Sequence, residues 1–143
     1  MKAFAALFSA LDESTKTSAK VAALADYFRT APDSDKLWTI ALFTGRRPKR
    51  VITASKLRLW AAEVAGLPDW LFEESYSIVG DLAETIALVL PAPRATSDAS
   101  LTGWIMHLRA LGMQDDDARK AGIIAAWDRL PPAERFLFTK LLT

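Results

Sequence analysis

The spacing of apolar residues predicts α-helices along nearly the whole chain. Near the N-terminus, Phe4, Leu7, Phe8 and Leu11 follow one another at i, i+3, i+4 and i+7. This spacing places all four side chains on one face of a helix. Comparable stretches follow, separated by polar residues, glycine or proline, and no hairpin turn sequence lies between them. We therefore predict an all-α fold of about eight to nine helices.

Caps and stop signals set the expected helix boundaries. The second helix ends before Pro32, with Val21, Leu24 and Phe28 as its expected buried stripe. The later helices are bounded by Gly45, Thr53 or Ser55, Gly66, Pro68, Gly80, Asp81 and Pro91. Beyond these we expect helices over approximately residues 101–111, 116–130 and 133–143.

The length of 143 residues is typical of a single domain, 1–143. The stretch 91–100 is rich in proline, serine and alanine and is the one plausible linker. It suggests two lobes, 1–90 and 100–143, joined by residues 91–99. An apolar content of 51% and five tryptophans indicate a real core, in which we expect most of the tryptophans to pack.

The residue inventory does not indicate an enzyme. The chain has no cysteine, so disulfides and thiolate metal sites are excluded, and its single histidine is His107. The acidic run 115–117 fits the start of a helix better than a metal site, because neighbouring side chains on a helix point in different directions. We predict no catalytic residue and no metal site. The N-terminus lacks a signal peptide and no apolar run could span a bilayer, so we expect a cytoplasmic protein.

The charges are strongly segregated although the formal net charge is only +1. No acidic residue lies between Asp35 and Glu63, a stretch with seven basic residues: Lys36, Arg46, Arg47, Lys49, Arg50, Lys56 and Arg58. From Glu63 to Glu84 there are six carboxylates and no Lys or Arg. Such segregation is typical of a protein that presents one face to a polyanion.

The candidate binding residues fall in two groups. Gly45 and Pro48 favour an exposed loop that carries Arg46, Arg47, Lys49 and Arg50, whose cations suit backbone phosphates. No base-reading element is evident, so the expected ligand is a nucleic-acid backbone. A second, weaker candidate site gathers hydroxyls, amides and ammonium groups at a helix start, with the residues Lys16, Thr17, Ser18 and Lys20. Lys56 and Arg58 fit the solvated face of a helix better.

The segment Phe43–Pro91 resembles the N-terminal region of bacterial ATP-dependent DNA ligases. The similarity rests on the elements GRRPKR, LPDWLFEESY and VGDLAETIALVLP, in this order, and on AERFLFTKLLT at residues 133–143. The resemblance implies an all-helical domain that binds backbone phosphates of nicked duplex DNA from the minor-groove side. It assigns the basic loop, Gly45 to Arg50, and the turn Gly80–Asp81 to DNA contacts. Asp81 would repel phosphate, so we interpret it first as a helix cap.

The family's adenylation motif, a lysine followed two residues later by Asp-Gly, is absent. Either the chain is an excised N-terminal domain, which we expect, or the ligase has lost its catalytic part. We expect ATP and Mg²⁺ to be bound only by a catalytic domain that this chain lacks. The resemblance implies work with the adenylation and oligonucleotide-binding-fold domains of a ligase in DNA repair, replication or recombination. We expect a monomer. The alternative is a helical protein-interaction module whose basic loop docks on an acidic partner or an acidic face of the same chain.

Overall fold

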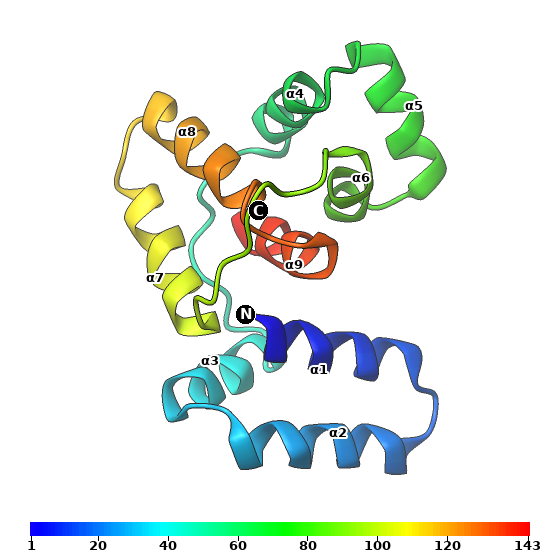
Figure 1. Cartoon of the computed structure of the whole chain (residues 1–143), viewed down its shortest axis with the longest axis vertical. Helices are drawn as coiled ribbons and strands as arrows, with labels where there is room; N and C mark the ends of the chain where they lie inside the picture. The colour runs from blue at the N-terminus through cyan, green and yellow to red at the C-terminus, as the bar shows by residue number, and fades with distance from the viewer. The chain divides into compact units, whose positions relative to one another are not determined.

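The computed structural model describes all residues, 1–143, and contains α-helices and no strands (Figure 1). The all-α prediction is confirmed. The nine helices are α1 (Lys2–Glu13), α2 (Thr17–Thr30), α3 (Asp33–Phe43), α4 (Ala54–Ala65), α5 (Asp69–Val79), α6 (Leu82–Val89), α7 (Leu101–Gly112), α8 (Asp116–Trp127) and α9 (Pro132–Leu142). None of the helices is long and apolar enough to cross a membrane.

Side-chain caps start three of the helices where the sequence indicated. The side chains of Thr53, Asp81 and Asp115 accept hydrogen bonds from backbone amides in the first turns of α4, α6 and α8. Gly66 and Gly80 end α4 and α5 in the left-handed conformation, with φ of 69° and 84°. Glycine adopts this conformation without the steric cost that a Cβ imposes, which explains why these helices stop there.

The end of α8 differs from the prediction. The helix stops at Trp127 rather than at residue 130. After Trp127 the amides of Arg129 and Leu130 bond three residues back, to the carbonyls of Ala126 and Trp127. This tighter turn, followed by the two prolines at 131 and 132, leaves no room for another α-helical turn.

The chain forms two compact units. Unit 1 comprises residues 1–47 and 98–106, and unit 2 comprises residues 48–97 and 107–143. These units differ from the lobes 1–90 and 100–143 that the proline-rich stretch suggested. The physical reason lies in backbone hydrogen bonds: the amides of Ala95 and Ser97 donate to the carbonyls of Asp128 and Arg129. The expected linker is therefore attached to unit 2, which it shares with α8.

In unit 1, α1 packs against α2 (Figure 1). Phe4 and Leu7 of α1 are buried. The Phe4 ring stacks on Phe43 of α3, with 5.8 Å between the ring centroids. The predicted stripe of α2 is wrong in part, because Val21 is 58% exposed and Tyr27 is buried instead. The Tyr27 hydroxyl is held by a hydrogen bond with Thr39 Oγ1 at 2.8 Å, a polar pairing that apolar periodicity does not show.

A buried carboxylate connects α3 with α7 inside unit 1. Asp35 Oδ1 accepts hydrogen bonds from the backbone amide and the hydroxyl of Thr102, at 2.9 and 2.5 Å. Both donors lie at the first turn of α7, where amides have no partner within the helix. Asp35 therefore caps a helix from a distant part of the sequence.

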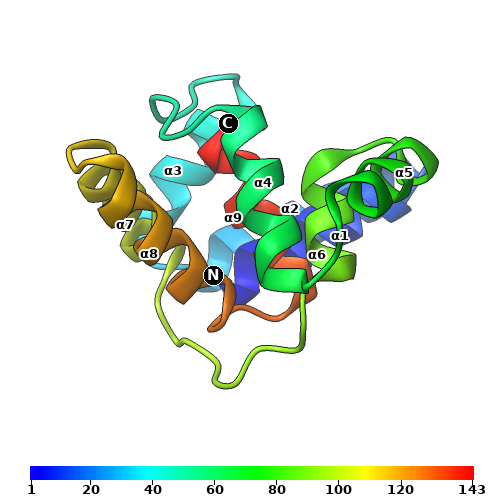
Figure 2. The same ribbon diagram turned by 90° about the horizontal axis from the view of Figure 1, so that it is seen from above.

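In unit 2, α6 packs against α9 and also contacts α4 and α5. α5 and α6 lie side by side in both ribbon views (Figures 1 and 2). The fully buried side chains include Leu57, Phe72, Ile86, Phe138 and Leu142. The amphipathic helices bury these stripes together, which removes apolar surface from water.

The tryptophans do not all occupy the core. Trp104 and Trp127 are buried, Trp38 and Trp60 are half-buried, and Trp70 is 70% exposed. The expectation that most of them pack in the core is thus too broad. On α5 the buried position belongs to Phe72, which leaves Trp70 on the opposite side of the helix start.

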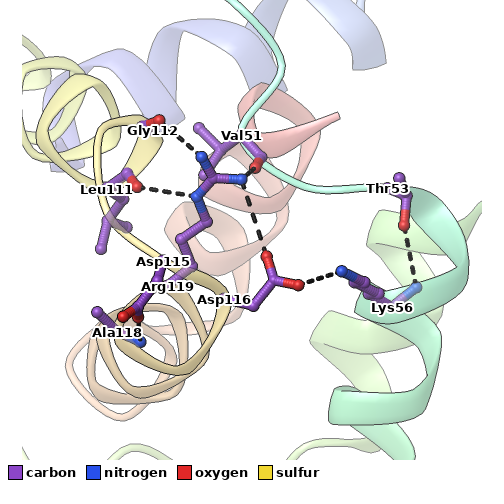
Figure 3. A network of polar contacts seen from close by, with 9 residues as sticks. All are labelled: Val51, Thr53, Lys56, Leu111, Gly112, Asp115, Asp116, Ala118 and Arg119. Atoms are coloured by element: carbon purple, nitrogen blue, oxygen red, sulfur yellow. Dashed lines mark hydrogen bonds and ion pairs between the residues drawn. The ribbon is translucent and has the colours of Figure 1, made fainter.

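Arg119 connects three segments of unit 2 (Figure 3). Its Nε and Nη2 donate to the carbonyls of Leu111 and Gly112 at the end of α7, and its Nη1 donates to the Val51 carbonyl at 3.0 Å. One guanidinium thereby satisfies carbonyls that the helix end leaves without a partner. Beside it, Asp116 forms an ion pair with Lys56 of α4.

Asp81 has a second partner besides the cap. Its carboxylate accepts from the Glu84 amide at 2.9 Å and forms an ion pair with Lys140 of α9. Desolvation by itself would raise the pKa of Asp81. The hydrogen bond from Lys140 and the bonds from the amides of Glu84 and Ala83 outweigh it, so the pKa lies below its ordinary value.

Replacing Arg119 by alanine should destabilise the fold by about 2–3 kcal/mol, because three carbonyl acceptors lose a charged donor. The measurement is urea unfolding followed by circular dichroism. Arg29→Ala is the matched control, since Arg29 pairs only with Asp26 at the surface and should change stability by less than about 0.5 kcal/mol. Equal effects of the two substitutions would contradict the connecting role of Arg119.

Asp81→Asn should make stability less sensitive to acid. The asparagine keeps the cap but loses the charge that pairs with Lys140. A carboxylate whose pKa is lowered by folding stabilises the fold above its unfolded pKa, about 3.9, and this stabilisation is lost as pH falls through the lower folded value. Urea midpoints measured between pH 7 and pH 2 should therefore favour the wild type at neutral pH and converge with the variant at the acid end. A gap that stays constant over this range would contradict the ion pair.

Candidate nucleic-acid interface

The basic loop begins at a helix end that the sequence dictates. The last residue of α3 is Phe43, and Gly45 follows with φ of 87°. The Gly45 amide donates to the Leu42 carbonyl at 3.2 Å, and the Arg46 amide donates to the Ala41 carbonyl at 2.8 Å. This pair of bonds is the Schellman arrangement, which needs a left-handed residue at the position of Gly45. The two amides are therefore occupied, and what the loop offers to a ligand is its side chains.

The cations of the loop are exposed. Arg46, Arg47, Lys49 and Arg50 all have exposed side chains. Arg46 and Arg47 belong to unit 1, whereas Lys49 and Arg50 belong to unit 2. The loop ends at Val51, which is buried and whose amide donates to the Leu142 carbonyl at 3.0 Å. The Gly45 turn in unit 1 and Val51 in unit 2 thus anchor the two ends of the basic segment.

Three other cations of unit 2 have carboxylate partners, unlike Lys49 and Arg50 of the loop. Lys56 pairs with Asp116, and Lys120 pairs with Glu63 at 2.8 Å. Arg58 lies 3.5 Å from Glu73 and 6.0 Å from the centre of the Tyr76 ring. No ion pair and no side-chain hydrogen bond involves Arg46, Lys49 or Arg50. Three positive charges of the loop therefore have no counter-charge within the protein.

Three of the six carboxylates in the acidic segment that follows, Glu63 to Glu84, form ion pairs with cations of unit 2. Glu63, Glu73 and Asp81 are bound to Lys120, Arg58 and Lys140 respectively. Neither Lys49 nor Arg50, the loop cations of unit 2, forms an ion pair with this segment. The paired carboxylates of this segment therefore bind cations other than Lys49 and Arg50.

The start of α2 presents a second concentration of donors. Lys16 is the N-cap residue, with no side-chain cap, and no acidic residue lies in the first turn. The amides of residues 17–19 have no hydrogen-bond partner, since the first bond of the helix is from the Lys20 amide to the Lys16 carbonyl. Lys16, Thr17 and Ser18 are exposed and Lys20 is half-buried. Such a helix start attracts anions through its amides and its dipole.

The two candidate groups of unit 1 lie apart. The Phe4–Phe43 stack places the end of α3 at the N-terminal end of α1, whereas α2 begins beyond the C-terminal end of α1 (Figure 1). α1 has 12 residues, so its length separates the two groups by about 18 Å. Any single ligand that meets both must be extended.

The turn at Gly80 offers less to an anion than the loop does. The Gly80 amide already donates to the Tyr76 carbonyl at 2.8 Å, and the adjacent Asp81 is a cap, as interpreted from the sequence. Lys140 compensates the Asp81 charge, a partner 59 residues away that no sequence pattern indicated. Sequence reasoning therefore missed Lys140, and only the packing of α6 on α9 reveals it.

The acidic run 115–117 behaves as a helix start. Asp115 accepts from the Ala118 amide at 2.9 Å, and Asp116 is paired with Lys56. The hydrogen bond from Lys56 is the main reason why the pKa of Asp116 is lowered. No group of three or more His, Cys, Asp or Glu side chains is arranged to hold a metal ion.

The family model described as DNA ligase N terminus matches residues 1–143. No curated protein and no solved structure matches the chain. Because this match covers every residue and the all-α frame agrees with it, the chain belongs to the DNA ligase N terminus family and is an N-terminal domain of an ATP-dependent DNA ligase.

Proposed function

We propose that this domain binds duplex DNA through its backbone phosphates, independently of sequence, and positions nicked DNA for sealing by the ligase core. The observation that carries the proposal is the charge pairing. Lys56, Arg58 and Lys120 are neutralised within unit 2, whereas Arg46, Lys49 and Arg50 are exposed and have no carboxylate partner. Like charges this close along the chain repel one another unless an anion lies between them.

The chemistry of the loop suits phosphate. A guanidinium can donate two parallel hydrogen bonds to phosphate oxygens, and an ammonium acts as a point charge. Each phosphate that is neutralised releases condensed counterions, which drives binding and makes the affinity depend on salt. None of these contacts reads a base edge, so the expected binding is independent of sequence.

The start of α2 is the proposed second contact. Its free amides, the Thr17 and Ser18 hydroxyls and the charges of Lys16 and Lys20 suit one phosphate group. Duplex DNA is an extended polyanion with regularly spaced phosphates, and therefore can meet two groups about 18 Å apart. The amides of Gly45 and Gly80 already donate hydrogen bonds within the protein, so neither is available to a phosphate. In this proposal Gly45 turns the chain into the basic loop, and Gly80 only allows a phosphate to approach the backbone closely.

The family supports a role within a DNA ligase, and we propose the following division of work. The domain is not the catalytic core of a ligase. We propose that ATP, Mg²⁺ and the sealing chemistry belong to the adenylation and oligonucleotide-binding-fold domains of the parent protein. In this proposal the domain adds affinity by avidity, since linked domains bind one duplex together. We place it in the cytoplasm, as a monomer, in DNA repair, replication or recombination.

Changing Arg46, Arg47, Lys49 and Arg50 together to alanine should remove most of the salt dependence of DNA binding. Four neutralised phosphates correspond to a slope of about −3.6 in log K against log salt, or an about 150-fold loss of affinity between 50 and 200 mM salt. The measurement is fluorescence anisotropy with labelled nicked duplexes of unrelated sequence. The wild type should bind them alike, and the variant should show a much flatter slope.

The matched control removes four exposed cations elsewhere, in the variant with Lys2, Arg29, Arg109 and Arg129 changed to alanine. It has the same net charge as the loop variant and should lose far less affinity. Equal losses would mean that overall charge, rather than the loop, attracts DNA. If the wild type fails to bind even at low salt, the chain is better described as a protein-interaction module.

The two halves of the loop should contribute separately. Each double variant, Arg46→Ala with Arg47→Ala or Lys49→Ala with Arg50→Ala, is expected to reduce the magnitude of the salt slope by about 1.8. The same anisotropy titration at five salt concentrations measures the slope. If one double variant accounts for the whole change, only one unit carries the phosphate contacts.

A further inference from the structure

A groove in unit 2 contains a buried cation that lacks a carboxylate partner. The groove has a volume of about 340 Å³ and is bounded by α4, α8, α9 and the segment after α6. Its walls are mainly apolar and include Val64, Leu90, Pro91, Ile124 and Trp127. Apolar walls with a few polar groups, at a volume near the lower end for ligand pockets, are typical of a site for a small ligand.

Arg135 is the buried cation of this groove. It is 2% exposed, and no carboxylate forms an ion pair with it. Its Nε and Nη2 donate to the Trp127 carbonyl at 3.1 and 2.6 Å, and Nη2 also donates to the Pro91 carbonyl at 3.0 Å. Nη1 donates to no acceptor in the protein, and this atom is not completely buried. This nitrogen is therefore the donor that remains for a ligand.

The burial of this charge is costly. Desolvation lowers the pKa of Arg135, and the nearby Asp128 opposes that effect only in part. An arginine nevertheless remains protonated, so its charge must be compensated in place. Carbonyl oxygens supply part of the compensation, and an anion with good geometry at the remaining donor adds to it.

The rim of the groove indicates which anion fits. Asp128 is bound to Arg94, whose Nε lies 2.6 Å from Oδ2. The charged groups of the groove are thus two guanidinium groups and one carboxylate, which leaves one positive charge. A singly charged carboxylate neutralises this excess, whereas a doubly charged phosphate would leave a negative balance and be repelled by Asp128.

We propose that the groove binds a monocarboxylate attached to a compact apolar group, with Arg135 Nη1 donating to the carboxylate and the apolar walls holding the attached group. The ligand is either a free branched or aromatic carboxylic acid, or the carboxyl terminus of a peptide that ends in an apolar residue. Both sources share the same chemistry. The site is independent of the proposed DNA contacts, because none of its lining residues belongs to the basic loop or to the start of α2.

Titrations followed by ¹H–¹⁵N correlation spectra of the full chain test this site. The probes are 3-methylbutanoate and acetyl-glycyl-leucine with a free carboxyl group, each compared with its neutral amide, and inorganic phosphate. We expect saturable shifts of the Arg135 Nε–H, the Ile124 amide and the Trp127 indole. The amides should bind at least about tenfold more weakly, because they lack a charged hydrogen bond. The carboxylate that binds with the higher affinity shows whether the ligand is a free acid or the carboxyl terminus of a peptide.

Ala125→Trp fills the groove without altering Arg135, since Ala125 is an exposed residue of its wall. This variant should lose the shifts at Arg135 and Trp127 while its circular dichroism melting curve stays within a few degrees of the wild type. The control is Ala110→Trp, an exposed alanine of α7 outside the groove, which should bind as the wild type does. Equal affinity for acid and amide, tighter binding of phosphate, or full binding by Ala125→Trp would each overturn the proposal.

Discussion

The hydrogen bonds of the buried Arg135 guanidinium connect three segments of unit 2. From α9 it reaches the carbonyl at the end of α8 and the carbonyl of Pro91, directly after α6. The neighbouring Thr139 accepts from the Trp127 indole at 3.0 Å, so α9 secures the end of α8 at two points. Because a buried guanidinium is costly without acceptors, the end of α8 and Pro91 must lie where their carbonyls can accept from Nε and Nη2.

The structural cations of unit 2 differ from the candidate DNA contacts in whether a carboxylate of the protein compensates their charge. Lys56, Arg58, Lys120 and Lys140 each connect two helices through a carboxylate. The loop after α3 is held by backbone hydrogen bonds instead, so Arg46, Lys49 and Arg50 are not needed to stabilise the fold. A protein that binds phosphates needs cations of this second kind. The family of the chain, DNA ligase N terminus, is consistent with that division.

Much of the fold could be predicted because its signals are local. The Gly66 and Gly80 helix ends and the Thr53, Asp81 and Asp115 caps depend on the residues within one turn, and all of them were found where expected. The structure differs from the expectations where a distant partner decides. Tyr27 replaces Val21 in the core because Thr39 satisfies its hydroxyl, and the proline-rich stretch joins unit 2 because the turn after α8 offers it two carbonyls.

The sequence by itself determined the all-α class, most helix boundaries and the exposed position of the basic loop, since periodicity, caps and the Gly45 turn act over a few residues. Only the tertiary structure decided which charges are neutralised. Lys56 and Arg46 are both basic residues of the stretch that has no acidic residue. Lys56 forms an ion pair with Asp116, which lies 60 residues further along the chain, whereas no carboxylate lies within ion-pair distance of Arg46. The groove around Arg135 was likewise invisible in the sequence, because its walls come from four separate segments. Charge compensation and burial act through space, and the sequence order of residues does not reveal them.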